Sequence, residues 1–324
     1  MAVRRIVCSE YGPPALLTIV EEPDLVPGPG HVVVAVESAG VNYVDVLLVA
    51  GTYQIKIPPP FTPGTELAGT VVALGDGVTS WTVGDRVLAT TFGAFASQVS
   101  VPVRALSRVP DGLDLDRAAA LVQSYTTMWF ALTRRTTLTP GQTVLVLGAG
   151  GGIGLAAIDV ATALGATVIA AASSADKLAA ARAAGATDVI NYTTEDLKVQ
   201  AKALSGGGVD VVVDPVGGEH AEPALRATGW NGRFIVLGFA GGAIPKLPAN
   251  LVLLNNRTVI GVDWGAWTGR DPAGQQAVLD EVLGAVADGR LTPPAPQRVP
   301  LDETASVLQA ALDRRLVGKT VLNP

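Results

Sequence analysis

The sequence predicts an α/β protein in which a doubly wound parallel sheet is joined to a separate β-rich unit. Three observations predict this fold. Residues 142–147 form an apolar strand that leads into a glycine cluster and a run of helix formers. Strand and helix patterns then alternate as far as residue 262, which is typical of a parallel sheet with its ligand crevice at the carboxyl ends of the strands. The residues before 120 are instead rich in Val, Gly and Pro and contain short strands separated by turns.

The glycine cluster between residues 148 and 154 predicts a nucleotide site. A helix that begins directly after such a turn points its unpaired N–H groups and positive dipole end at a bound phosphate. The strict G-x-G-x-x-G pattern is absent, because Ala149 takes its first position. A glycine-rich turn can also serve close helix packing alone, and that alternative stays open. The expected pyrophosphate contacts are Gly150, Gly151, Gly152, Ile153 and Gly154.

The alternating region after this turn supplies the other strands and helices. Strands are expected at residues 167–171, 188–190, 209–214, 234–237 and 258–262, and helices at residues 175–184, 195–204 and 219–228. The last strand forms an edge of the sheet that must be covered or paired. We therefore expect a homodimer that forms at residues 258–262.

The N-terminal segment is expected to form a compact β-barrel from short strands bounded by turn signals. These strands are expected at residues 5–9, 17–21, 31–38, 69–74, 86–89 and 96–101. One stretch departs from the strand pattern, because residues 41–51 resemble a short helix that ends at Gly51. Its polar residues Asn42 and Asp45, with Tyr53 beyond it, either cap and border that helix or carry function, and the pattern favours neither interpretation.

The composition argues against several classes of protein. A net charge of −6 and a pI near 5.0 offer no basic surface for nucleic acid. No uncharged run is long enough to span a bilayer and no signal-peptide core follows the N-terminus, so we expect a cytoplasmic protein without membrane contact. One cysteine and two histidines cannot supply a disulfide or the usual zinc ligand set, so no metal is expected.

The strand after the glycine turn indicates which dinucleotide the site prefers. Folds that select NAD commonly place an acidic residue about 20 positions beyond the turn, where it binds the ribose 2′-hydroxyl. Here the strand ends at Ala172, and Ser173, Ser174 and Lys177 follow. The serines can hydrogen-bond a 2′-phosphate and the lysine can neutralise it, so NADPH is the expected cofactor. The alternative is that Ser174 only caps the next helix and Lys177 is a solvated surface residue.

Ordered motifs along the whole chain resemble those of one superfamily. The motifs are Asn42-x-x-Asp45 with Gly51-x-Tyr53, Pro63 to Gly69, Gly84-Asp-Arg-Val87, Ala149 to Gly154, and Asp214-Pro-Val-Gly-Gly218. The chain resembles the medium-chain dehydrogenase/reductase superfamily and, within it, the zinc-independent, zeta-crystallin-like NADPH:quinone oxidoreductase branch. Zinc enzymes of this family carry His before the glutamate of the second motif and a catalytic Cys near Asn42, whereas this chain has Thr65 and no such cysteine.

This resemblance implies a domain layout and further cofactor contacts. A GroES-like catalytic domain would span residues 1–119, a Rossmann NADP-binding domain residues 120–262, and the second part of the catalytic domain residues 263–324. A helix over residues 123–132 would lead into the Rossmann domain. The resemblance places Thr127 near the nicotinamide carboxamide, Tyr192 at the adenosine-phosphate end, and Gly238 and Phe239 beside the nicotinamide. It also implies a homodimer.

Hydride transfer to a conjugated acceptor needs close positioning and little other catalysis. Without a metal, hydrogen-bond donors must stabilise the developing oxygen charge, which gives Asn42 and Tyr53 the expected catalytic roles. Asp45, Leu47 and Trp264 are expected to line the substrate site. Trp264 and its neighbour Trp267 can equally pack at a hinge or an interface. Leu47 and Val49 stand where quinone reductases frequently carry Tyr and Arg, which favours a more apolar pocket.

The expected function is therefore the NADPH-dependent reduction of a small quinone or of the C=C bond of an α,β-unsaturated carbonyl compound. Two alternatives remain open. One is a pathway-specific enoyl or enoyl-thioester reductase. The other is a non-catalytic NADPH-binding protein in which the reductase fold serves a structural or sensing role.

Overall fold

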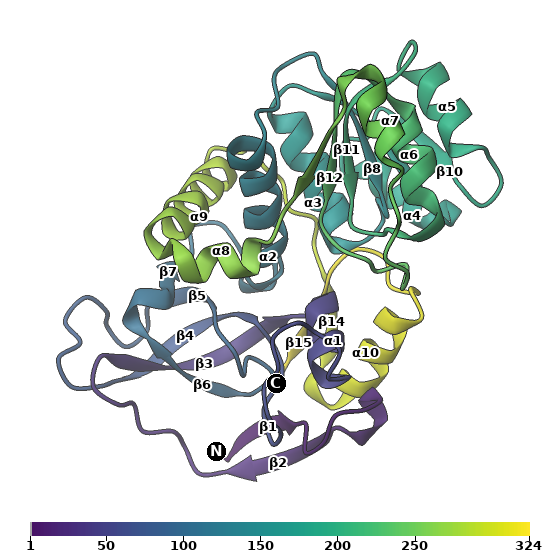
Figure 1. Ribbon diagram of the computed structural model, residues 1–324. Coiled ribbons are helices and arrows are strands. Elements are labelled where there is room, and N and C mark those ends of the chain that lie inside the picture. The colour runs from purple at the N-terminus through teal and green to yellow at the C-terminus, as the bar shows by residue number, and fades with distance from the viewer. Residues whose placement is uncertain (1) are drawn as a thin grey trace. The chain divides into compact units, whose positions relative to one another are not determined.

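The protein folds as two compact units. The computed structural model describes residues 2–324 (Figure 1). Unit 1 comprises the chain up to Gln123 together with Pro294–Pro324, and unit 2 comprises Ser124–Pro293. Each unit has a hydrophobic core of its own.

A six-stranded parallel sheet forms the centre of unit 2, as the sequence predicts, with strand order β10-β9-β8-β11-β12-β13. The strands are β8 (Thr143–Leu147), β9 (Thr167–Ala172), β10 (Asp188–Asn191), β11 (Val209–Asp214), β12 (Thr228–Val236) and β13 (Thr258–Gly261). The strand order reverses between β8 and β11. Open α/β sheets bind ligands at such a switch point, outside the carboxyl ends of the strands.

Two pairs of helices cover this sheet (Figure 1). Helices α3 (Gly152–Ala163) and α4 (Ala175–Ala183) pack together and against β9. Helices α5 (Leu197–Leu204) and α6 (Ala221–Ala227) form the second pair, and α6 contacts β11 and β12. Right-handed crossovers between parallel strands place the two pairs on opposite faces, so the sheet is doubly wound.

Local sequence accounts for these elements. The central strands are continuously apolar because both of their faces are covered, and residues 144–147 and 211–213 have 0% exposure. Polar caps start the helices that follow, since Asp196 Oδ1 accepts a hydrogen bond from Val199 N at 2.9 Å at the start of α5.

The remaining helices of unit 2 lie outside the crossovers. They are α2 (Leu115–Phe130), which begins in unit 1 and continues as a π-helical turn at Ala131–Arg135, α7 (Ala249–Leu253), α8 (Trp264–Arg270), α9 (Pro272–Ala287), and the short 3-10 helices η4 (Gly218–His220) and η5 (Leu254–Asn256). The expected helix at residues 219–228 is shorter, because buried Thr228 opens β12 and its hydroxyl accepts a hydrogen bond from Arg257 Nε at 2.6 Å.

Unit 1 ends its first segment at Gln123 and resumes at Pro294, whereas the layout implied by the resemblance has boundaries at residues 119 and 263 and remains a prediction. Contacts with α2 keep residues 263–293 in unit 2. Trp267 stacks on Phe130 with ring centroids 4.1 Å apart, and Glu281 accepts a hydrogen bond from Trp129 Nε1 at 2.7 Å. These contacts join residues far apart in the sequence, so the local pattern carries no sign of them.

Unit 1 is built on a seven-stranded sheet with the path β14-β15-β3-β4-β5-β7, and β6 also pairs with β3. Its strands are β3 (His31–Gly40), β4 (Glu66–Leu74), β5 (Arg86–Thr90), β6 (Gln98–Pro102), β7 (Leu106–Arg108), β14 (Gln297–Pro300) and β15 (Thr320–Asn323). Strands β1 (Val3–Val7) and β2 (Thr18–Glu22) form a separate pair. The last strand, β15, joins β3 by pairing Val321 with Gly40.

Two helices pack against each other in unit 1. They are α1 (Tyr43–Val49), which matches the expected short helix, and α10 (Thr304–Leu312). Short 3-10 helices lie at η1 (Pro14–Leu16), η2 (Val103–Ala105) and η6 (Leu301–Glu303). Val41 N donates to Thr320 O at 3.0 Å, so the start of α1 lies beside the start of β15.

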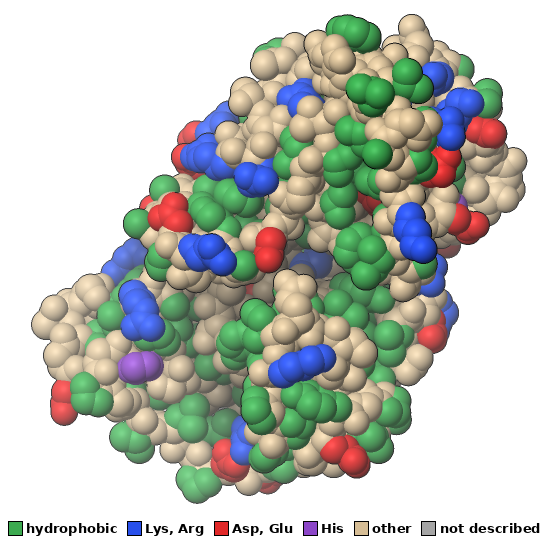
Figure 2. Space-filling view, viewed as in Figure 1, with side chains coloured by type: hydrophobic (Ala, Val, Ile, Leu, Met, Phe, Trp, Pro, Cys, Tyr) green, Lys and Arg blue, Asp and Glu red, His purple; other side chains and the backbone are tan. Residues whose placement is uncertain are grey.

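The surface is mixed in character. On the face shown in Figure 2, Lys and Arg side chains are interspersed with acidic and hydrophobic ones. None of the helices within residues 2–324 combines the length and the apolar character needed to cross a membrane. Strand β13 lies at the edge of its sheet, where pairing with a second copy of the chain remains a prediction.

Two helical glycines of unit 2 should respond oppositely to replacement by alanine. A Cβ atom on Gly154 would lie 2.4 Å from Gly148 O, whereas one on Gly284 in α9 meets nothing within 4 Å. Gly154→Ala should lower the free energy of unfolding by about 1 to 3 kcal/mol. Gly284→Ala should raise it by about 0.5 to 1 kcal/mol, because alanine is the better helix former. Urea unfolding followed by circular dichroism checks both changes, and equal effects would contradict the expected role of Gly154.

Candidate active site

The glycine turn between β8 and α3 forms a close-fitting cradle of main chain. A Cβ atom on Gly154 would lie 2.4 Å from Gly148 O and 2.6 Å from Ala149 Cα. A Cβ atom on Gly150 would lie 2.4 Å from Lys177 Cβ and 2.8 Å from Lys177 Cα. A change in the Lys177 side-chain conformation cannot relieve this clash, because the Cα atom belongs to the main chain. Glycine is therefore required at both positions, and the first turn of α4 lies directly against the cradle.

The start of α3 presents main-chain donors at this turn. Gly151 is the N-cap residue, and half-exposed Gly152 and Ile153 form the first turn of the helix. The first N–H groups of a helix have no partner within it, and the dipole of this 12-residue helix favours an anion there. The five glycine-turn residues predicted from the sequence thus meet at the switch point of the sheet.

The end of β9 carries no carboxylate beside this turn. Ala172 is fully buried, and the half-buried Ser173 and Ser174 follow it. Ser174 caps α4, because its Oγ accepts a hydrogen bond from Lys177 N at 3.5 Å. In this long bond the Ser174 hydroxyl acts only as an acceptor, so its hydrogen can still be donated to another group.

The loop after β11 approaches the aromatic residue predicted to border the nicotinamide. Asp214 Oδ1 accepts hydrogen bonds from Val216 N and Gly217 N, both at 2.8 Å, and burial raises the pKa of Asp214. Gly217 has a φ of 67°, and a Cβ atom there would lie 2.9 Å from Phe239 Cδ1. The tight loop and its glycine therefore make room for the Phe239 ring, which follows Gly238.

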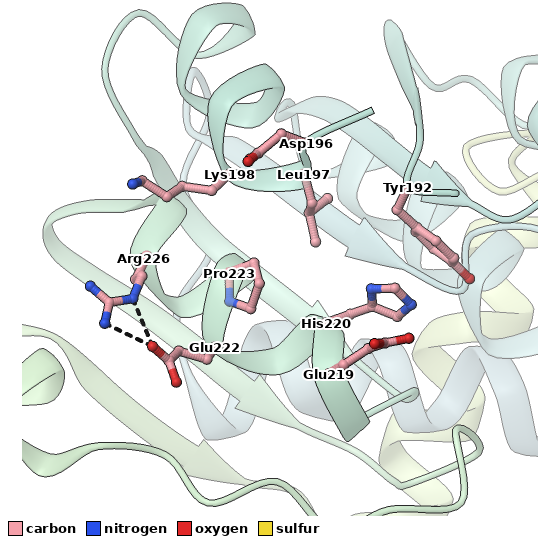
Figure 3. Close-up of a pocket in the computed structure, with 9 residues that line it drawn as sticks. All are labelled: Tyr192, Asp196, Leu197, Lys198, Glu219, His220, Glu222, Pro223 and Arg226. Carbon is pink, nitrogen blue, oxygen red and sulfur yellow. Dashed lines mark hydrogen bonds and ion pairs between the residues drawn. The ribbon is translucent and has the colours of Figure 1, made fainter. Parts of the chain in front are cut away.

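A cavity of about 560 Å³ opens between the residues that follow β10 and β11. Figure 3 shows Tyr192 and His220 with their rings side by side, and the ring centroids are 4.2 Å apart. Arg226 and Glu222 form an ion pair at 2.7 Å elsewhere in its lining. The cavity is lined by Tyr192, Asp196, Leu197, Lys198, Glu219, His220, Glu222, Pro223 and Arg226.

Unit 1 contains a hydrogen-bonded group of polar side chains that joins α1, β4 and the start of β15. We call it the Lys319 cluster, and its members are Asn42, Asp45, Thr65, Glu66 and Lys319. Lys319 Nζ donates to Asn42 Oδ1 and to Glu66 Oε1, both at 2.6 Å, and to Val41 O at 3.1 Å. Asn42 Nδ2 donates to Glu66 Oε1 at 2.8 Å.

The charges of this cluster are buried. The side chain of Glu66 has 0% exposure and that of Lys319 has 11%. The second carboxylate oxygen of Glu66 accepts a hydrogen bond from Gln123 N at 2.7 Å. A Cβ atom on Gly40 would lie 2.3 Å from Glu66 Oε1 and 2.6 Å from Ala119 O, so the carboxylate occupies space that only glycine leaves free.

Asp45 sits one turn into α1 and is fully buried. Its carboxylate accepts hydrogen bonds from Asn42 N at 2.7 Å and from Thr65 Oγ1 at 3.2 Å. Burial, aided by the charge of Glu66, raises the pKa of Asp45 to about 7, although the Asn42 N–H and the Lys319 charge oppose this rise. Zinc enzymes of the family that the sequence resembles carry His at the position of Thr65. In this protein the Thr65 hydroxyl donates a hydrogen bond to Asp45.

Comparison with known proteins assigns the family. The model of the alcohol dehydrogenase GroES-like domain matches residues 28–111, and that of zinc-binding dehydrogenases matches residues 152–283. A quinone oxidoreductase-like protein 2 homolog of Nematostella vectensis is 38% identical over an alignment of 324 residues, which covers 99% of this chain and 88% of the relative. The chain belongs to the medium-chain dehydrogenase/reductase superfamily, zeta-crystallin-like branch.

Solved structures agree with this assignment. A quinone oxidoreductase of Pseudomonas syringae is 31% identical with a TM-score of 0.90, over 100% of both chains. The Escherichia coli quinone oxidoreductase, solved in complex with NADPH, is 28% identical with a TM-score of 0.89, over 99% of this chain and 100% of that one. The expected Rossmann sheet and GroES-like domain of an oxidoreductase of this superfamily are thereby confirmed.

The predicted catalytic and substrate residues of unit 1 lie at both ends of α1. Asn42 and Asp45 join the Lys319 cluster at its start. Half-buried Tyr53 lies beyond the end of the helix, where its N–H donates to Leu47 O at 3.1 Å. The seven helical residues between Asn42 and Ala50 span about 10 Å along the helix axis. The structure therefore does not place Asn42 and Tyr53 on one turn.

The remaining predicted residues lie on the helices of unit 2. Half-buried Thr127 is on α2. Trp264 begins α8, and its buried indole N–H finds no acceptor within residues 2–324. Trp267, one turn later, stacks on Phe130, which also lies in unit 2.

Glu66 and Lys319 were not among the site residues predicted from the sequence. Glu66 carries a signal, because it is an acidic residue at the start of an apolar strand within the Pro63 to Gly69 motif, and a buried carboxylate needs a partner. Lys319 carries none, because only the pairing of β15 with β3 brings it to that carboxylate. Within residues 2–324, no three His, Cys, Asp or Glu side chains are grouped as a metal site, and independence from zinc remains a prediction for this superfamily member.

Asp45→Asn should flatten the pH dependence of stability. With a pKa of about 7 in the folded state, Asp45 keeps a proton that the unfolded chain releases near pH 4, so the parent loses stability as the pH rises between these values. The variant cannot ionise, and its free energy of unfolding relative to the parent should rise by roughly 1 to 4 kcal/mol over that window. Urea unfolding between pH 4 and pH 8 measures the difference, and parallel curves for the two proteins would contradict the raised pKa.

Proposed function

We propose that this protein is an NADPH-dependent reductase of quinones or of the C=C bond of α,β-unsaturated carbonyl compounds. The observation that carries the proposal is the Asn42 amide, which Glu66 and Lys319 hold as a hydrogen-bond donor beside the start of α1. A reductase without a metal needs such a donor to stabilise negative charge on the acceptor oxygen. Relatives and structural neighbours named quinone oxidoreductases support the substrate class.

The glycine cradle fits a dinucleotide. The turn leaves no space for a side chain at Gly150 or Gly154, as a backbone that must approach a pyrophosphate requires. The N–H groups of Gly152 and Ile153 would bind the phosphates at the start of α3, while the Gly151 N–H closes the turn by donating to Gly148 O at 3.0 Å. Tyr192, at the rim of the cavity in Figure 3, would border the adenosine-phosphate end.

The residues after β9 favour NADPH over NADH. Ser173 and Ser174 would hydrogen-bond a 2′-phosphate, and the ammonium group of Lys177 would neutralise it. The neighbour from Escherichia coli was solved with NADPH, which supports this preference. Thr127 would bind the carboxamide of the nicotinamide, which Gly238 and Phe239 would border.

In the proposed reaction, bound NADPH supplies the hydride. Asn42 Nδ2 donates a hydrogen bond to the acceptor oxygen as negative charge develops there, and the Tyr53 hydroxyl supplies the proton. Asp45 supports the Asn42 backbone, while Leu47 supplies an apolar side chain on α1 of unit 1 and Trp264 supplies one on α8 of unit 2. A homodimer that pairs the exposed β13 edges completes the proposed assembly.

A substrate panel separates this proposal from its alternatives. NADPH oxidation with simple quinones or enones supports the proposal, whereas turnover of enoyl thioesters alone supports the pathway-specific enoyl reductase. Tight NADPH binding without turnover of any member of the panel would instead indicate a non-catalytic binding protein.

Lys177→Ala should weaken NADPH binding selectively. Loss of one charge-assisted contact of about 1.5 to 3 kcal/mol should raise the Kd of NADPH by about tenfold or more and leave that of NADH nearly unchanged. Lys202→Ala, at the last turn of α5, is the matched control and should bind both cofactors as the parent does. Fluorescence titration of the parent and the two variants measures the six dissociation constants, and equal affinity of the parent for NADH and NADPH would refute the preference.

Asn42→Ala and Tyr53→Phe should lower kcat more than they raise KM. Groups that stabilise charge only as it develops act on the transition state, so kcat should fall by roughly 10- to 1,000-fold. Steady-state kinetics with a quinone and an enone tests this, with circular dichroism to confirm folding. If both variants turn over both acceptors at the parent rate, the two residues are scaffold.

A further inference from the structure

We infer that Lys319 and Glu66 are positioning residues that fix the Asn42 side-chain amide in one orientation, so that a single defined N–H of Asn42 faces the acceptor oxygen. This inference rests on the proposed function and assigns the two buried charges of unit 1 a task in it. Neither residue needs to touch the substrate, because each would act through the Asn42 amide.

The donors of Lys319 determine which amide atom faces it. An ammonium group has three hydrogens and cannot accept a hydrogen bond. All three are used, on Asn42 Oδ1, Glu66 Oε1 and Val41 O. The Asn42 atom 2.6 Å from Nζ must therefore be the carbonyl oxygen, since an amide N–H there would face another donor.

Glu66 determines the same orientation from the other side. An ionised carboxylate only accepts hydrogen bonds, and Glu66 Oε1 lies 2.8 Å from Asn42 Nδ2. A flipped amide would set its N–H groups against the ammonium and its oxygen against the carboxylate. The ion pair thus excludes the flip that an uncharged pocket would permit.

This geometry leaves one donor for a ligand. Of the two Nδ2 hydrogens, Glu66 binds one, and the other points in a different direction within the amide plane. Asn42 is half-buried whereas Glu66 is fully buried, so Asn42 is the more accessible of the two. The ammonium at Oδ1 and the carboxylate at Nδ2 hold the amide from opposite sides, which fixes the direction of the remaining N–H.

Burial of this ion pair argues for positioning better than for stability. Removing a lysine and a glutamate from water costs about as much as their attraction returns, and an apolar replacement of such a pair is often neutral or stabilising. If the ion pair served stability, a variant that lacks both charges would be less stable. If it serves positioning, that variant keeps most of its stability and loses activity.

Lys319→Met should lower kcat at least tenfold with quinone or enone, while the KM for NADPH changes less than threefold. Lys56→Met is the matched control, because Lys56 lies past the other end of α1 and donates to Gly51 O, and it should keep the parent kcat. Lys319→Met leaves Glu66 buried without a partner and should also lower the thermal midpoint. The double variant Lys319→Met with Glu66→Gln should recover most of that midpoint but not the kcat. A double variant that recovers both, or a Lys319→Met variant with the parent kcat, would overturn the inference.

A spectroscopic measurement tests the amide without any turnover. In protein labelled with ¹⁵N-asparagine, the side-chain amide signals of Asn42 are those lost in Asn42→Asp. They should shift or broaden in Lys319→Met and stay in place in Lys56→Met. Unchanged Asn42 signals in Lys319→Met would refute the fixed orientation. A parent that reduces neither quinones nor enones would refute the proposed function, and the spectra would still decide whether Lys319 orients the amide.

Discussion

The buried ion pair between Lys319 and Glu66 is the interaction on which the arrangement of the Lys319 cluster depends. Lys319 Nζ lies 2.6 Å from Glu66 Oε1, although 253 positions separate the two residues in the chain. Neither charge can remain alone in an apolar core, because an unpaired buried charge is strongly destabilising. The pairing of β15 with β3 brings Lys319 to Glu66, and residue 40 must be glycine because the Glu66 carboxylate occupies the space of a Cβ atom there.

The ion pair also explains why the start of α1 is suited to chemistry. Asn42 precedes the helix and contacts both charges, while Asp45 in the first turn supports its backbone from the other side. Burial, aided by the nearby Glu66 carboxylate, raises the pKa of Asp45 to about 7 even though the Asn42 N–H and the Lys319 ammonium oppose the rise. The cluster can hold a proton near neutral pH without exposing a charge to water.

The glycine cradle of unit 2 is formed by main-chain atoms and not by charged side chains. The cradle at the start of α3 exists because Gly150 and Gly154 carry no Cβ atom, and its donors are backbone N–H groups. Such a site tolerates changes in neighbouring side chains but no added atom at two positions. This chain thus combines a glycine turn formed by neighbouring residues with a polar cluster assembled from distant segments.

The sequence by itself determined the parallel sheet, the glycine turn, the absent carboxylate after Ala172 and the short helix at Asn42. A local sequence pattern predicts each of these features, because apolar runs, glycine spacing and helix caps depend on only a few neighbouring residues. Only the tertiary structure decided that the return to unit 1 lies at Pro294 and that Lys319 meets Glu66 and Asn42. Those outcomes depend on stacking, strand pairing and charge burial between residues far apart in the chain, and no local pattern records such contacts.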